Sequence, residues 1–282
     1  MSPSPSTFDA AEHYELAQWM SVQGVLVSAV LYYLVYQLTR ILQVRPPKFF
    51  RGLDAENRTL FRTGLTSYIH SIVSGVWSTY VVVTTPKLLA EIHGYADWQT
   101  LAMTAMSCGY FLMDLLLMLA KRTFLDTPFL IVHVHHVLVG MALWLTLRFN
   151  HGLSTYMVMS LVCEVNNWFL HGGKLLRKMG VTTDSTLYAV NDVLFLLTFF
   201  AFRLLPHVYA CTTLHDRNCV PVLWQWCVAL FCSHGLALLD VLMILQFAQS
   251  RLRMHRERQI RRQVANGNGT ANGAAADHKK EK

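Results

Sequence analysis

Seven apolar blocks, each close to the length needed to cross a lipid bilayer, constrain this chain more than any other feature. A helix needs about 20 mainly apolar residues to span the hydrocarbon core. The blocks cover residues 16–39, 66–85, 101–120, 129–149, 153–175, 186–205 and 222–247. The sequence therefore predicts an all-α, polytopic transmembrane bundle of seven spans, of which the Ser- and Thr-rich second is the weakest.

The composition excludes other classes of protein. Hydrophobic residues make up 53% of the 282 residues and charged residues only 15%, against about 25% charged in an ordinary soluble domain. The formal net charge of +7 would suit a nucleic-acid binder only if basic and aromatic residues were interleaved on one surface. Here the basic residues flank apolar blocks, so no nucleic-acid partner is expected.

The distribution of basic residues predicts the orientation of the chain. Lys and Arg are held on the cytosolic side of membrane proteins, and all but four of the 24 Lys and Arg residues fall on one side of the seven spans. This places the amino terminus in the lumen and the carboxyl terminus in the cytosol. We expect a lumenal tail over 1–15, a bundle over 16–248 and a basic, largely disordered cytosolic tail over 249–282.

The last four residues suggest a location. Lys279 and Lys280 are fourth and third from the carboxyl end, and this arrangement resembles a di-lysine retrieval signal, which coat machinery reads in the cytosol. The sequence thus predicts a multi-pass protein of the endoplasmic reticulum membrane. In the loop between spans six and seven, Cys211 and Cys219 could form a disulfide or remain free thiols.

Ionisable side chains inside the spans are the candidate functional residues. Such groups are costly in a membrane and are by default functional or paired with one another. Counting from the cytosolic end of each span at 1.5 Å per residue places several of them roughly 10 Å below the interface. The candidates for chemistry are His136, His135, Glu164 and Asp114. The candidates for binding are His133, Asn167, His171, Asp192, Asn191 and Arg203.

Helical periodicity indicates how these residues face one another. His133 and His136 share a face of span four, and Glu164, Asn167 and His171 share a face of span five, because residues three, four and seven apart lie together. Only about three residues connect the two spans, so they should be antiparallel neighbours. We therefore expect His136 near Asn167 or Glu164, in a polar chamber open toward the cytosolic leaflet. The alternative is a set of interhelical hydrogen bonds that only support packing.

A histidine beside a carboxylate is a competent general base and can also be a transient acyl nucleophile. These roles suit acyl transfer from a cytosolic donor to a membrane lipid, with His136 as first choice and Glu164 or Asp114 as the acid that orients it. Several histidines and carboxylates could instead bind zinc or iron, but residues 133–136 contain the one histidine cluster. We expect no metal site and no bound cofactor.

Four sequence motifs resemble the TLC-domain family of reticulum membrane proteins, which includes ceramide synthases and translocation-associated membrane proteins. They are the run from Gly109 to Asp114, the pair His135-His136, the run from Glu164 to Trp168, and the spaced residues Asn191, Phe195, Phe199 and Arg203. The resemblance covers roughly residues 54–249.

The resemblance implies specific roles. Ceramide synthases carry a histidine pair and two aspartates three residues apart, and these positions fall here on His135, His136, Glu164 and Asn167. One carboxylate is therefore kept and one is lost. This version looks more like the small TLC-domain-containing proteins, the fourth type most of all. The resemblance implies a role in membrane lipid homeostasis, with acyl-CoA as co-substrate if the protein is an acyltransferase; the alternative is a non-catalytic lipid sensor, lipid carrier or cargo receptor.

Overall fold

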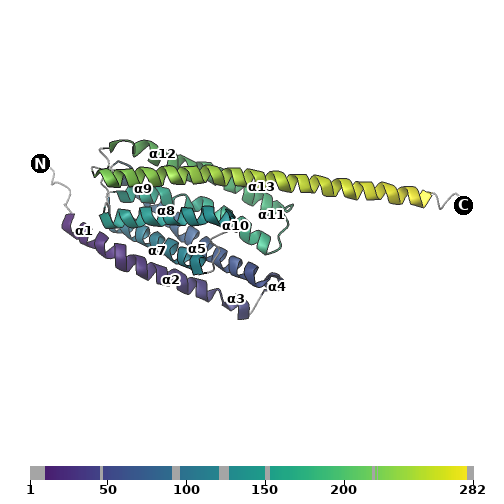
Figure 1. Cartoon of the computed structure of the whole chain (residues 1–282), viewed down its shortest axis with the longest axis horizontal. Coiled ribbons are helices and arrows are strands. Elements are labelled where there is room, and N and C mark those ends of the chain that lie inside the picture. The colour runs from purple at the N-terminus through teal and green to yellow at the C-terminus, as the bar shows by residue number, and fades with distance from the viewer. Residues whose placement is uncertain are drawn as a thin grey trace. The chain divides into compact units, whose positions relative to one another are not determined.

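The computed structural model describes residues 10–44, 47–90, 96–120, 127–149, 153–217, 220 and 222–277. All regular structure in these residues is helical, which confirms the predicted all-α class (Figure 1). The chain divides into two units, Met1–Ala237 and Leu238–Lys282. The candidate site lies wholly in the first unit.

The helices follow the predicted blocks, with shifted ends. Their bounds are α1 Ala10–Trp19, η1 Met20–Gly24, α2 Val25–Leu38, α3 Ile41–Val44, α4 Lys48–Arg51, α5 Ala55–Thr84, α6 Pro86–Ala90, α7 Trp98–Ala120, α8 Thr127–Phe149, α9 Ser154–Leu161, α10 Glu164–Lys178, α11 Thr186–Thr198, η4 Phe199–Leu204, α12 Leu205–Thr213 and α13 Leu223–Asp277. The elements η1 and η4 are π-helical turns that run into the α-helices on either side.

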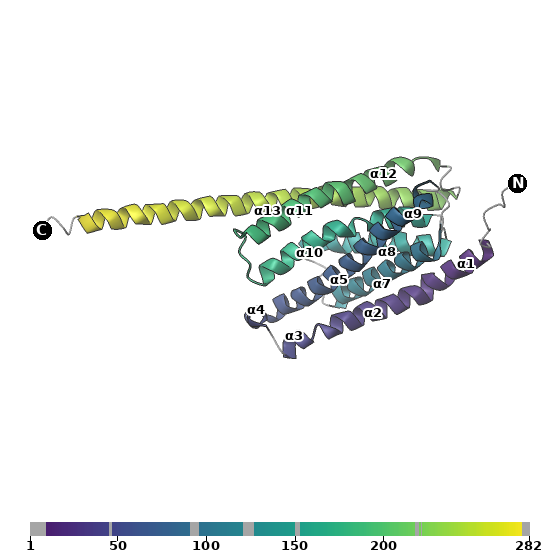
Figure 2. The ribbon, with the colours of Figure 1, turned by 180° about the vertical axis from the view of Figure 1, so that it is seen from behind.

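Helix α7 lies at the centre of the first unit. It packs against α2 on one side and α8 on another, while α10 packs against α5 and α11. Figure 2, which views the molecule from behind, shows α2, α5 and α7 running side by side. The approach of α7 to α2 depends on Gly109, where a Cβ atom would lie 2.5 Å from the backbone oxygen of Val25. Small residues allow helix backbones to approach closely in membrane bundles.

The polar side chains of α5 face the protein interior. Ser67, Ser71, Ser74 and Ser78 recur at spacings of three and four and are all buried. Three of these hydroxyls donate to backbone carbonyls one turn earlier, and Ser74 contacts Ser107 of α7 at 3.3 Å. Their hydrogen bonds are thus satisfied inside the protein, which explains how a Ser-rich helix of 30 residues can belong to an apolar bundle.

The cytosolic end predicted for α5 carries an N-terminal cap. Asp54 accepts hydrogen bonds from the backbone N–H of Asn57 at 2.7 Å and from its side-chain amide at 2.9 Å. The backbone bond, followed by the side-chain bond, holds the pKa of Asp54 below its usual value of 3.8. Nearby, the buried guanidinium of Arg62 donates to Thr39 Oγ1 and to the carbonyl of Tyr36, so α5 is tied to the end of α2.

Within the described residues, five helical segments are long and apolar enough to cross a membrane. They are Tyr14–Leu38, Trp98–Ala120, Val132–Phe149, Thr186–Thr213 and Leu223–Glu257. The second and fifth predicted spans are also helical, but α5 is rich in hydroxyls and the fifth is divided into α9 and α10. A membrane helical bundle is thereby confirmed, whereas the count of seven spans stays a prediction.

The division of the fifth span changes which helices face one another. The α-helix ends at Leu161 and restarts at Glu164, and α9 contacts α5, α7 and α8 whereas α10 packs mainly on α5 and α11. The histidine face of α8 therefore does not pack extensively on the face of α10 as expected, although His136 lies close enough to Glu164 to interact with it electrostatically. The short connection fixes only the neighbouring ends of two helices, and the break redirects the second half.

The carboxyl-terminal region also differs from expectation. The tail after Gln249, expected to be largely disordered, is helical as far as Asp277. Its first part is rich in Arg, with two Gln, and both are strong helix formers. Extending an existing helix also avoids the cost of nucleation. Cys219, Lys279 and Lys280 lie outside the described residues, so the disulfide and the retrieval signal stay untested.

Candidate functional site

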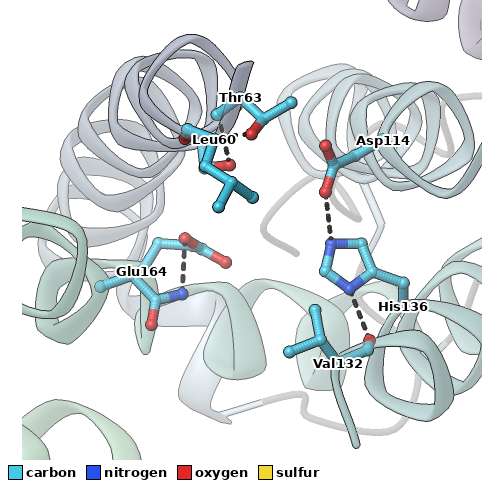
Figure 3. A network of polar contacts seen from close by, with 8 residues as sticks. Leu60, Thr63, Asp114, Val132, His136 and Glu164 are labelled. Atoms are coloured by element: carbon cyan, nitrogen blue, oxygen red, sulfur yellow. Dashed lines mark hydrogen bonds and ion pairs between the residues drawn. The ribbon is translucent and has the colours of Figure 1, made fainter. Parts of the chain in front are cut away.

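A buried pair formed by Asp114 of α7 and His136 of α8 lies between these neighbouring helices. Asp114 Oδ2 is 2.9 Å from His136 Nε2, and both side chains are almost fully buried. The other ring nitrogen of His136, Nδ1, lies 2.7 Å from the carbonyl oxygen of Val132 (Figure 3). Of the two acids considered as partner of His136, the structure thus brings Asp114 into contact.

These contacts restrict the protons of the pair. A carbonyl oxygen can only accept, so His136 Nδ1 carries a proton and donates it to Val132. The other ring nitrogen, Nε2, lies in contact with Asp114 Oδ2 without making a regular hydrogen bond to it. Both ring nitrogens of His136 therefore face a neighbouring oxygen atom.

A second buried group joins α10 to the π-helical turn η4. Asn167 Nδ2 donates to Glu164 Oε2 at 2.9 Å, and Arg203 Nη1 donates to Asn167 Oδ1 at 2.8 Å. All three side chains are buried. Glu164 is the first residue of α10, where the helix dipole favours a negative charge. Arg203 thus compensates the carboxyl group of Glu164 through the amide of Asn167.

An elongated, mainly apolar pocket begins beside Glu164. Its empty volume is about 1030 Å³, which includes space open to the outside. It is lined by α7, α8, α9, the first residue of α10, α12 and the start of α13. Along α8 the lining runs from His135 to Phe149, which corresponds to roughly 21 Å of helix. Phe149 and Trp224 meet edge to face at the other end, with ring centroids 5.4 Å apart. Glu164 and His135 lie toward the opposite end, and the lining also includes the polar residues Thr146, Ser160, Gln225 and Ser233.

An aromatic layer lies behind the Asp114–His136 pair. Tyr110 stacks on His70 with ring centroids 3.8 Å apart, and His70 Nδ1 is 3.1 Å from the hydroxyl of Tyr32. Phe111 contacts the rings of both His135 and His136 edge to face. These contacts give His70 a packing role between α2, α5 and α7.

The remaining predicted site residues lie outside these two groups of contacts. Asn191 of α11 donates to the backbone oxygen of Phe169 on α10 and lies against two glycines of α10, Gly172 and Gly173. His133 is buried one turn before His136, and His171 and Asp192 are half-buried.

Sequence reasoning missed His207, a buried residue of α12 that lines the pocket. The signal available in the sequence was its spacing of four residues from Arg203, which would place the two on one helix face. It also missed Asn166, a fully buried residue that bonds to α11.

The arrangement could support two kinds of chemistry. The pocket can hold a long apolar chain with its polar end near Glu164 and His135, and these two side chains could bind or deprotonate a polar group placed there. Among the residues that the structure describes, no group of three or more His, Cys, Asp or Glu side chains is close enough to hold a metal ion.

Comparison with known proteins identifies the family. The family model described as TLC domain matches residues 60–249, which contain both groups of buried contacts. The chain belongs to the TLC-domain family. The resemblance found in the sequence motifs is thereby confirmed.

Named relatives lie within the same family. TLC domain-containing protein 1 of Mus musculus is 31% identical over 186 residues, which cover 66% of this chain and 71% of the relative. TLC domain-containing protein 2 of Danio rerio is 28% identical over 207 residues, covering 70% and 79%. Human TLC domain-containing protein 2 is 33% identical over 141 residues, covering 50% and 52%. A closer relationship to the fourth type stays a prediction.

Proposed function

We propose that this protein binds a membrane lipid by holding one acyl chain in the pocket, and that it acts through this binding in lipid homeostasis of the endoplasmic reticulum membrane. The observation that carries the proposal is the long apolar pocket with Glu164 and His135 at one end. Ligand sites are typically apolar with a few polar groups that fix orientation. A lipid would place its polar part beside these two residues and its chain along α8.

The dimensions of the pocket support a single long chain. The lining of α8 from His135 to Phe149 corresponds to roughly 21 Å at the rise of an α-helix. An extended chain advances roughly 1.2 Å per single bond, judged from the extended peptide backbone. A chain of about 16 to 18 carbons would therefore fill the length of the pocket and end near the Phe149–Trp224 pair.

The proposal is tested by filling the pocket. Ala142 lines the pocket on α8, so Ala142→Trp should reduce the amount of lipid that co-purifies with the detergent-extracted protein, measured by native mass spectrometry and lipid extraction. Ala189→Trp, on an exposed position of α11, is the matched control and should retain lipid. Equal lipid content in folded Ala142→Trp protein would contradict the proposal.

A second candidate function is acyl-CoA-dependent acyl transfer of the ceramide synthase type, to a sphingoid base or a related lipid. One observation favours it, namely that His135 faces the pocket beside Glu164 while the neighbouring His136 is held by Asp114. His135 would serve as base or nucleophile, and His136 would support it through the fixed α7–α8 contact. The non-catalytic alternative is a lipid sensor, carrier or cargo receptor that uses the same pocket only for binding.

Mass spectrometry separates the two candidates. Wild-type protein, His135→Ala and His136→Ala are incubated with long-chain acyl-CoA, and covalent acyl adducts and acylated lipid products are measured. An adduct or product that is lost in His135→Ala supports acyl transfer. Co-purified lipid with neither adduct nor product supports the binding function alone. If both folded variants gave the same products as wild type, neither histidine would take part in the reaction.

A further inference from the structure

The π-helical turn η4 determines which way Arg203 points. Asn191, Phe195 and Thr198 of α11 all make contacts with α10 and therefore define the face that α11 turns toward it. In a regular α-helix each residue advances by about 100°, so position 203 would lie roughly 120° from Asn191 and position 202 roughly 20° from it. Without a change of register, Arg203 would point away from α10.

The π-helical turn supplies this change. Its i→i+5 bonding accommodates one extra residue, so Arg203 takes the angular position that residue 202 would have in a regular helix. The contacts agree with this geometry: Arg203 is buried and donates to Asn167 of α10 at 2.8 Å. The buried residues that follow, Pro206, His207 and Ala210, continue the same face at spacings of three, four and seven.

Asn166 holds the junction between α11 and η4. Its amide nitrogen donates to the carbonyl of Phe195 at 2.9 Å and to Thr198 Oγ1 at 3.1 Å. A transition from α to π bonding disturbs the regular pairing of the nearby carbonyls, and a donor from a neighbouring helix can compensate for it. Asn166 is fully buried, so this donor comes from the protein and not from solvent.

We propose that Asn166 and Arg203 are positioning residues that act on Glu164 through the π-helical turn. Asn166 stabilises the junction, the turn directs Arg203 onto Asn167, and Arg203 fixes the amide whose Nδ2 donates to Glu164. Glu164 Oε2 is thereby held by a fixed donor. The result is a carboxylate that lines the pocket in one fixed orientation.

Other charged or titratable groups surround this carboxyl group. His135 of α8 and His207 of α12 line the same pocket, and Figure 3 shows His136, with its partner Asp114, across from Glu164. None of these side chains is an arginine or a lysine. Arg203 is therefore the permanent cation whose removal should act most directly on Glu164.

The inference rests on the proposed function for its purpose, but its test needs no lipid. Dicyclohexylcarbodiimide, an apolar reagent, modifies protonated carboxyl groups within membrane proteins, and peptide mass spectrometry quantifies the modification at Glu164. In Arg203→Gln, Glu164 should be modified roughly tenfold faster than in wild type at neutral pH. The variant loses the charged donor to Asn167, and a hydrogen bond that involves a charged group contributes roughly a factor of ten or more to an equilibrium. Arg203→Lys should be intermediate, and Asn166→Ala should also increase the rate.

Two controls keep the test specific. Arg217→Gln removes an exposed arginine and should leave the rate unchanged, and Glu164→Gln gives the background. Equal modification of Glu164 in wild type and in folded Arg203→Gln overturns the inference. Lipid content is measured separately. If Arg203→Gln left the labelling of Glu164 unchanged while the protein still bound lipid, the positioning role would be wrong and the proposed function would stand.

Two variants that shorten or lengthen the helix by one residue test the turn itself. This test does not require that Arg203→Gln folds. Ala201 is an exposed residue of η4. Its deletion should convert the turn to a regular helix with the arginine on the same face, so the labelling of Glu164 should stay low. A second alanine inserted after Ala201 should rotate the arginine by about 100° and raise the labelling. The same rate in both folded variants would overturn the proposed role of the turn.

Discussion

Replacing Gly109 by alanine tests the close approach of α2 and α7, on which the position of Asp114 depends. A Cβ atom at this site would lie 2.5 Å from the oxygen of Val25, 2.6 Å from Ser28 Cβ and 2.7 Å from the backbone nitrogen of Ala29. Two of these neighbours are backbone atoms and cannot move aside by changing rotamer. Ordinary contact begins at 3.4 Å, so the helices must separate by about 0.9 Å at this point, which is the difference between these two distances.

The energetic cost can be assembled from three effects. Overpacking of this kind costs about 1–3 kcal/mol. The separation would also weaken the bond from Ser28 Oγ to the carbonyl of Met106, now 2.6 Å, at a cost of about 1 kcal/mol. Alanine itself favours the helix over glycine by about 0.5–1 kcal/mol. The expected net loss of unfolding free energy in Gly109→Ala is about 1–3 kcal/mol.

The assay is unfolding of the purified protein in detergent by SDS titration, followed by circular dichroism. Gly140→Ala on α8 is the matched control, because its Cβ would meet Phe111 at an ordinary 3.7 Å. This variant should gain about 0.5–1 kcal/mol through helix propensity alone. If Gly109→Ala were as stable as Gly140→Ala, the described packing of α2 on α7 would be refuted.

Three further predictions concern separate parts of the chain. Asp114→Ala should lower the unfolding free energy by about 1–3 kcal/mol, because it removes the acid that contacts the buried Nε2 of His136, whereas Asp114→Asn should lose less; thermal unfolding in detergent compares them. Because the pKa of Asp54 is lowered in the folded protein, the ionised Asp54 stabilises the fold above its usual pKa, and this stabilisation is lost as the pH falls through the lowered pKa. Below about pH 4 the unfolding free energy of Asp54→Asn should therefore fall less than that of wild type. The proposed location in the endoplasmic reticulum predicts that replacing Lys279 and Lys280 by serine releases the protein from it, as seen by microscopy. An unchanged location would contradict the proposed retrieval signal.

The sequence was sufficient to predict the helical membrane fold and part of the site. Long apolar blocks can form only a few structures in a bilayer, and the five spans that meet the criteria coincide with predicted blocks. Asp114 and His136 were placed at one depth by counting residues, and the structure brings them to 2.9 Å. Depth along a helix follows from its fixed rise, so this kind of prediction needs no knowledge of packing.

The rotation and breaks of the helices could not be predicted in the same way. The break before Glu164 has neither proline nor glycine beside it, since both are absent from residues 153–171, so no residue signals it. It directs α10 toward α5 and α11 and separates Asn167 from the histidine face of α8. The π-helical turn at η4 has one local signal in Pro206, which follows it and lacks a backbone donor, but the proline alone does not give the direction of Arg203. Both features depend on contacts with other helices.

The pairing of Glu164 with Asn167 has a meaning that the family comparison alone obscures. Where ceramide synthases carry two aspartates, the asparagine looks like the loss of a catalytic carboxylate. In this structure Asn167 accepts from Arg203 and donates to Glu164 at the same time. An aspartate at this position could accept from Arg203 but could donate to Glu164 only if protonated. Asn167→Asp would therefore place two carboxyl groups behind one arginine and favour a shared proton. The Glu–Asn arrangement instead yields one carboxyl group with a fixed donor, which is what the proposed lipid-binding role requires.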